Sequence, residues 1–88
     1  MNTTDLIAAR ACLVSAEGHF DHNSLEPVPS PCVSVCRMTA DRSHCEGCFR
    51  TIDEIRAWSG ADAGQRRAIW AALLRRAGVP QPQELAHP

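Results

Sequence analysis

Apolar residues recur at helical spacing in the C-terminal half of this 88-residue chain. Ile52, Ile55 and Trp58 follow one another at intervals of three, so they lie on one face of a short helix. Thr51 precedes this stretch and Glu54 stands three residues later, which together form a capping box. We therefore predict a helix that begins after Thr51 and ends at the Ser-Gly pair that follows Trp58.

A second helix is predicted directly downstream by the same kind of signal. Asp62 and Gln65 form another capping box, and Gly78 and Pro80 provide the stop, so the helix should end at about Ala77. The apolar stripe of this helix consists of Ile69, Trp70, Leu73, Leu74 and Ala77. The two helices are expected to form a hairpin.

The two ends of the chain have weaker patterns. Residues 1–30 contain a brief apolar stretch, Leu6–Val14, with a possible cap at Thr4–Asp5, and then several turn-forming residues. We expect this arm to be mostly irregular, with at most a helical turn or two. Residues 80–88 carry proline at three positions, which predicts a disordered tail. Residues 31–79 are then the part that folds.

This foldable part has little material for a core. The whole chain contains two Phe, two Trp and no Tyr. A unit of this size lies close to the limit of about 40 residues below which a disulfide or metal is usually needed. A bound metal would therefore add stability that the apolar residues lack.

Four cysteines lie within seventeen residues, spaced C-x3-C-x8-C-x2-C, at Cys32, Cys36, Cys45 and Cys48. Two close pairs of soft thiolate ligands joined by a short polar loop can converge on one metal, and both zinc and iron–sulfur clusters accept four thiolates. In the turn between the last two cysteines, Gly47 is expected to take a positive φ so that backbone N–H groups face the sulfurs. Four protein ligands leave no position for a reacting water, so we predict that the chain is not an enzyme.

Other interpretations of the cysteines are weaker. The chain begins without the basic region of a signal peptide, and its first apolar stretch is too short to span a membrane, so a cytoplasmic protein with reduced thiols is expected. A redox dithiol at Cys45 and Cys48 would need a βαβ context that the sequence lacks. His44 adjoins a cysteine, but adjacent residues rarely reach one metal, and Cys12 is expected to be a small apolar residue.

Charge does not choose between zinc and an iron–sulfur cluster. Zinc with four thiolates and an oxidised four-iron cluster with four thiolates carry the same net charge, and Arg37, Arg42 and Arg50 would either offset it or form solvated surface. The loop length permits both metals.

The charge pattern also bears on nucleic acid. The formal net charge is −1, which argues against a general polyanion binder. The arginines of the second predicted helix are spread around it at about 100° per residue instead of forming a stripe. One of them, Arg66, lies a turn before Trp70 and is expected to stack on its ring. Nucleic acid is therefore a disfavoured partner.

The run Pro31–Met38, the segment Cys45–Ile55 and Trp58 together resemble the domain-of-unknown-function family 1289. These are short bacterial proteins with four cysteines, commonly described as predicted iron–sulfur proteins, and the resemblance covers about residues 30–77. It implies ligand roles for the four cysteines of the C-x3-C-x8-C-x2-C motif and a bacterial cytoplasmic setting, and it implies no reaction.

The sequence thus predicts a small, metal-stabilised, mainly α-helical protein, with a four-cysteine metal-binding loop followed by a two-helix hairpin. We expect one iron–sulfur cluster or Zn²⁺, an accessory or interaction role and a protein partner, with no membrane. Two alternatives remain open: an electron-transfer or iron–sulfur-handling protein, and a zinc module that contacts nucleic acid.

Overall fold

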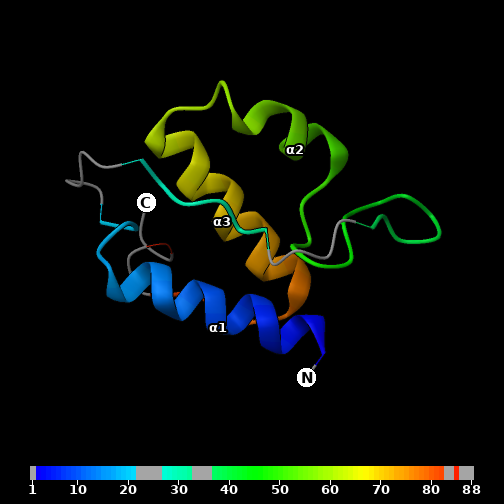
Figure 1. The fold of residues 1–88 in the computed structure, drawn as a ribbon, viewed down its shortest axis with the longest axis horizontal. Helices are drawn as coiled ribbons and strands as arrows, with labels where there is room; N and C mark the ends of the chain where they lie inside the picture. Colours follow the sequence, from blue (N-terminus) through cyan, green and yellow to red (C-terminus); the bar gives the residue numbers. More distant parts are fainter. Residues whose placement is uncertain (1, 22–26, 33–36, 83–84, 86–88) are drawn as a thin grey trace.

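The computed structural model describes residues 2–21, 27–32, 37–82 and 85. Within these residues the fold is mostly helical, as predicted, with helices α1 (Thr3–Ala16), α2 (Ile52–Trp58) and α3 (Ala63–Ala77). Figure 1 shows α1 along one side of the molecule, α3 crossing its middle and α2 on the far side from α1. The described residues contain no strand beyond one isolated antiparallel bridge, between Met38 and Cys45.

Both predicted capping boxes are present. The Thr51 hydroxyl accepts from the Glu54 backbone N–H at 3.1 Å, and the Glu54 carboxylate accepts from the Thr51 N–H at 2.8 Å. Asp62 and Gln65 make the equivalent pair at 2.7 and 2.9 Å. Helix α3 ends at Gly78, whose φ of 73° suits glycine because other side chains are strained in that region. The bounds of α2 and α3 therefore agree with the sequence prediction.

The expectation of a mostly irregular N-terminal arm needs correction over Thr3–Ala16, which forms the 14-residue helix α1. Its cap is Asn2, which accepts from the Asp5 N–H at 2.8 Å, two residues before the cap expected from the sequence. The buried face of α1 consists of Ile7, Ala11 and Val14. Packing of such a face stabilises helices that are marginal in isolation.

The core lies between α1 and α3. Trp70 is fully buried at its centre, and the Phe20 ring meets it edge to face, with 5.3 Å between centroids and an interplanar angle of 69°. Around this pair lie the buried side chains of Ile7, Val14, Val28, Leu73 and Leu74. The other tryptophan, Trp58, is only partly buried. The N-terminal helix is therefore part of the same core as the hairpin.

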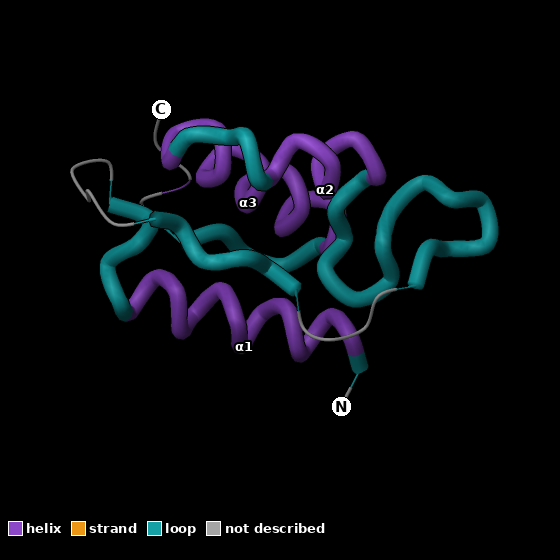
Figure 2. Tube along the Cα trace, turned by 45° about the horizontal axis from the view of Figure 1, so that its top comes forward, coloured by secondary structure: helices purple, strands orange, loops and turns teal. Residues whose placement is uncertain are grey.

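A segment that runs from Val28 to Cys32 joins this core to the first cysteine of the four-cysteine motif. The Trp70 indole Nε1 donates to the Pro29 carbonyl at 3.0 Å, and the guanidinium of Arg10 donates to the Ser30 carbonyl at 3.1 and 3.2 Å. In Figure 2 this segment passes between α1 and the other two helices. Helices α1 and α3 thus hold the backbone that leads into Cys32.

The C-terminal tail makes contacts that a disordered segment would not make. Among its described residues, Gln81 donates to the Ala71 carbonyl at 2.9 Å, and Leu85 packs against the core. The amide of Gln81 and the apolar side chain of Leu85 therefore attach the described part of the tail to the folded domain.

Among the helices in the described ranges, none has the length and apolar character needed to cross a membrane.

The contribution of α1 is directly testable. The Ile7→Ala variant should lose about 2–5 kcal/mol of unfolding free energy, because Ile7 is fully buried against α3 and truncation leaves a cavity. The matched control is Leu13→Ala on the same helix, where the side chain is 53% exposed and the change should stay within about 0.5 kcal/mol. Urea unfolding followed by circular dichroism measures both. Equal effects of the two variants would contradict the packing of α1.

Candidate metal centre

Three of the four predicted ligands line one cavity. Cys32, Cys45 and Cys48 surround a space of about 260 Å³. The other described residues that line it are Arg37, Met38, Arg50, Ile52 and Ile55. Cys36 lies outside the described residues. The fold therefore brings Cys32, at the end of the Val28–Cys32 segment, to the two cysteines that precede α2.

The full ligand set stays a prediction. Across residues 2–21, 27–32, 37–82 and 85, no three His, Cys, Asp or Glu side chains form a group close enough to hold a metal ion. The four described cysteines, Cys12, Cys32, Cys45 and Cys48, form no disulfide. All three thiols around the cavity thus keep the chemistry that thiolate ligation requires.

The turn that carries the last two cysteines is tightly built. Cys45 pairs with Met38 in the antiparallel bridge, and its N–H donates to the Arg50 carbonyl at 2.7 Å. The Phe49 N–H donates to the Cys45 carbonyl at 2.8 Å and closes the turn. The positive φ expected at Gly47 falls instead on Phe49, with φ of 63°. That conformation is rare for a bulky residue, so the hydrogen bond and the packing around the turn must hold it.

The surroundings of the two buried sulfurs differ. Burial raises the pKa of the Cys45 thiol, but hydrogen bonds from the backbone of Cys48, Gly47 and Arg37 outweigh burial, so this pKa lies below its ordinary value. For Cys48, burial dominates and raises the pKa, although the Arg50 Nε donates to its sulfur at 3.2 Å. Backbone N–H groups and a guanidinium directed at sulfur are what a cluster of thiolates needs around it.

Arg50 is the main addition of the structure to the predicted site. The residue is 7% exposed, and its guanidinium lies 5.3 Å from the centroid of the Trp58 ring. The sequence left two roles open for Arg50, offsetting the charge of the metal site or forming solvated surface, and the structure buries it beside Cys48. Arg50 therefore connects the Cys48 sulfur to the side of α2 that carries Trp58.

Arg66 corrects one predicted contact. Its guanidinium lies 5.2 Å from the centroid of Trp58, not on Trp70, and its Nε donates to the Trp58 carbonyl at 3.0 Å. The reason is that Trp70 turns into the core between α1 and α3, which leaves Trp58 as the ring beside the start of α3. Arg76, near the other end of α3, donates to the Phe49 carbonyl and to Glu54 at 3.0 Å. Arg66 therefore links the start of α3 to the end of α2, and Arg76 links α3 to Phe49 at the end of the cysteine turn.

Three other residues considered in the sequence, His44, Arg37 and Arg42, also lie in the described part of the structure. His44 stacks on Phe49 with 5.5 Å between ring centroids, and its Nδ1 lies 2.9 Å from the Ser43 hydroxyl oxygen. These contacts agree with a structural role for His44 in the loop. Arg37 lines the cavity and pairs with Glu46 at 2.8 Å, whereas Arg42 lies on a neighbouring groove.

The three helices of the described residues and a cavity lined by cysteines define a small, mostly helical, cysteine-rich protein. The chain belongs to the family of proteins of unknown function DUF1289, whose model matches residues 30–77. The resemblance inferred from Pro31–Met38, Cys45–Ile55 and Trp58 is therefore confirmed.

Curated relatives agree with this assignment. The chain is 33% identical over 60 residues to the uncharacterized protein YdhL of Escherichia coli O6:H1 (strain CFT073), an alignment that covers 64% of this chain and 75% of that protein. It is 37% identical over 43 residues to the uncharacterized protein YdhL of Escherichia coli K12, covering 49% of this chain and 53% of that protein. The chain thus spans about half the length of the K12 protein. No solved structure matches this chain.

Proposed function

We propose that this chain is a small cytoplasmic metal-binding module that serves as an accessory to a partner protein. In this proposal Cys32, Cys36, Cys45 and Cys48 hold one zinc ion or one iron–sulfur cluster. The observation that carries it is the cavity shared by three of these cysteines, which come from two separate segments of the chain. Zinc would stabilise the fold as a closed structural site, and an iron–sulfur cluster would supply a one-electron redox centre.

The surroundings of the cavity support thiolate ligation. Four thiolates leave a zinc ion or an oxidised four-iron cluster with excess negative charge, and two guanidinium groups, those of Arg37 and Arg50, lie on the cavity lining. The backbone of the Cys45–Cys48 turn directs donors at sulfur, which favours the deprotonated thiol. The protein therefore offers both the donor atoms and the compensating charge.

Colour and reduction behaviour distinguish a structural zinc module from an electron-transfer or iron–sulfur-handling protein. An electron-transfer or iron–sulfur-handling protein requires a brown protein with visible absorption and a reversible reduction, whereas a structural zinc module is colourless. Hydrogen bonds to cluster sulfurs tune reduction potential, so the Arg50–Cys48 contact gives this alternative a specific structural basis. We assign no catalytic role, because a four-thiolate site is closed to a reacting water.

Arg50 provides a test of the site that does not remove a ligand. The Arg50→Gln variant should weaken metal affinity by about 10–100-fold, because the substitution removes the donor to the Cys48 sulfur and a nearby positive charge. Competition titration with a chelator of known affinity measures the change on purified, metal-loaded full-length chain.

The matched control is Arg37→Gln, which removes a guanidinium from the same cavity lining but one that pairs with Glu46 and is largely exposed. We expect a smaller loss of affinity for this variant. Equal affinities of Arg50→Gln and the unmodified chain, with folding verified by circular dichroism, would show that the cavity is not where metal binds.

A further inference from the structure

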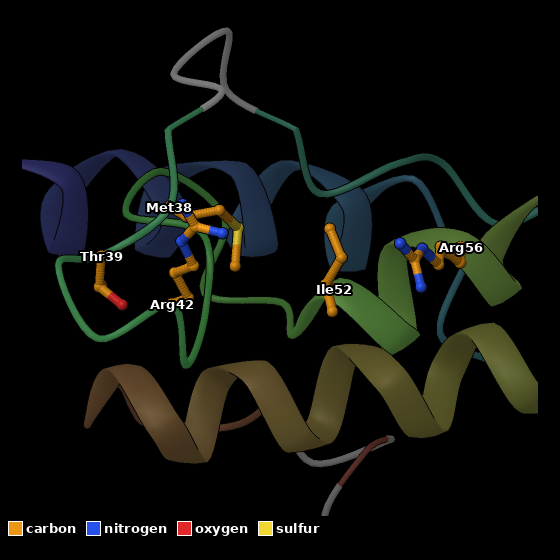
Figure 3. A pocket seen from close by; sticks show the side chains of 5 residues that line it. All are labelled: Met38, Thr39, Arg42, Ile52 and Arg56. Atoms are coloured by element: carbon orange, nitrogen blue, oxygen red, sulfur yellow. The ribbon is translucent and has the colours of Figure 1, made fainter.

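A second hollow lies beside the cysteine cavity. This groove of about 560 Å³ is lined by Met38, Thr39, Arg42, Ile52 and Arg56, and we name it the Arg42–Arg56 groove. Figure 3 shows Ile52 in its middle, with Arg56 on one side and Met38 and Arg42 on the other. Among the described residues that line it, none is acidic.

The two arginines are available to a ligand. Neither the Arg42 nor the Arg56 side chain makes a hydrogen bond or ion pair with another residue in the described part of the chain, and both residues are exposed. The other arginines near the site differ, since Arg37, Arg50, Arg66 and Arg76 each contact a partner within the fold. The positive charge of the groove is therefore not compensated by its own lining.

The loop holds Arg42 in place on this groove. Arg42 has a φ of 59°, a conformation uncommon for a side chain of this kind, and its N–H donates to the Thr39 carbonyl at 2.9 Å. The neighbouring Asp41 carboxylate accepts from the Thr39 hydroxyl at 2.6 Å and from the Ser43 N–H at 3.0 Å. The hydrogen bond from Thr39, followed by those from Ser43, lowers the pKa of Asp41 to about 2. This carboxylate is thus engaged by its own loop.

The floor of the groove is apolar and lies against the cysteine cavity. Ile52 is 42% exposed, which is high for a large aliphatic side chain on a short helix. Met38 and Ile52 line both the groove and the cysteine cavity, so they form the wall between the two. A ligand bound in the groove would therefore be separated from the cysteine cavity by the side chains of Met38 and Ile52.

We propose that the Arg42–Arg56 groove docks an acidic segment of a partner protein. The segment places an apolar side chain over Met38 and Ile52 and directs carboxylates at Arg42 and Arg56. Arginine favours carboxylates because its planar guanidinium donates two parallel hydrogen bonds, and arginine and methionine are enriched at protein interfaces. The inference deepens the proposed accessory role and rests on it, since it places the partner against the wall of the metal site.

The test is selection of peptides from a random display library on the metal-loaded full-length chain, followed by affinity measurement with the selected synthetic peptides. We expect peptides with two or more Asp or Glu residues around a large apolar residue, and binding that weakens as salt is raised. Backbone amide shifts in NMR spectra should change at Thr39, Arg42, Ile52 and Arg56. The double variant Arg42→Glu/Arg56→Glu should weaken binding by about tenfold or more, because both contacts become repulsive.

Arg75→Glu is the control, since Arg75 is exposed on α3 and lies outside the groove. It should leave peptide affinity within about twofold, as expected for a charge that makes no direct contact. The proposal is overturned if no peptide is selected, if the selected peptides lack acidic residues, or if the double variant and Arg75→Glu behave alike. Binding of a single-stranded oligonucleotide to the groove without peptide binding would also overturn it. Metal content is measured on the same samples. If the protein carries metal but fails these tests, only the docking proposal is rejected. If the protein carries no metal, the proposed metal-binding function is rejected.

Discussion

The Cys48→Ser variant should lose its bound metal and more than about 5 kcal/mol of unfolding free energy, a larger effect than any single core truncation. Cys48 is 2% exposed, and its sulfur receives the Arg50 Nε at 3.2 Å. A serine hydroxyl does not ionise at neutral pH and is a poor ligand, so the variant should lose one of the four proposed metal bonds and leave the Arg50 guanidinium buried beside a weaker acceptor. Metal analysis and urea unfolding of the purified variant measure the two losses.

Cys12→Ser is the matched control for this prediction. It makes the same chemical change at an exposed position of α1, outside residues 30–77 that match the family. We expect full metal content and a change within about 0.5 kcal/mol. Retention of metal by Cys48→Ser, or an equal loss in both variants, would contradict the assignment of Cys48 as a ligand.

Trp70→Ala should cost about 3–5 kcal/mol, because Trp70 is fully buried between α1 and α3. The substitution also removes the Nε1–H that donates to the Pro29 carbonyl at 3.0 Å, and Pro29 lies in the segment that leads into Cys32. We therefore expect weaker metal affinity together with the loss of stability. Urea unfolding of the metal-loaded variant and a chelator competition measure both quantities.

Two further variants separate the causes. Trp70→Phe keeps an aromatic ring in the core but removes the donor and part of the side-chain volume. Its cost should be about 1–3 kcal/mol from the unsatisfied, partly buried acceptor, plus a contribution from the smaller ring, and should stay below that of Trp70→Ala. Trp58→Ala removes the other tryptophan, which is only partly buried, and should cost less than Trp70→Ala. If Trp58→Ala proves the more destabilising, the core does not lie between α1 and α3.

The sequence was most informative where structure is set locally. Helices α2 and α3 are fixed by two capping boxes and by Gly78, all within a few residues of the helix ends, and each was predicted with its bounds. The length of helix α1 was underestimated, although Ile7, Ala11 and Val14 stand at helical spacing. Its stabilising partner is α3, some sixty residues further along the chain, and no local signal indicates that contact.

The directions in which side chains point were the second feature that the sequence did not predict. The sequence placed Arg66 near Trp70, but the direction in which each tryptophan points depends on how the hairpin packs, and Trp58 receives the guanidinium. The burial of Arg50 could not be predicted for the same reason. In the Cys45–Cys48 turn, glycine was the reasonable choice for a positive φ, yet the turn closes one residue after Cys48, at Phe49. The cysteine spacing predicted a shared site, and the three described cysteines of the four-cysteine motif line one cavity.

The central claim is that the four cysteines bind one metal centre. The most direct test is the metal and sulfide content of the full-length chain purified without oxygen from its own host, together with its visible spectrum. The claim predicts either one zinc per chain and no colour, or iron and sulfide in the ratio of a single cluster with visible absorption. Protein that is folded and carries neither zinc nor iron would contradict it.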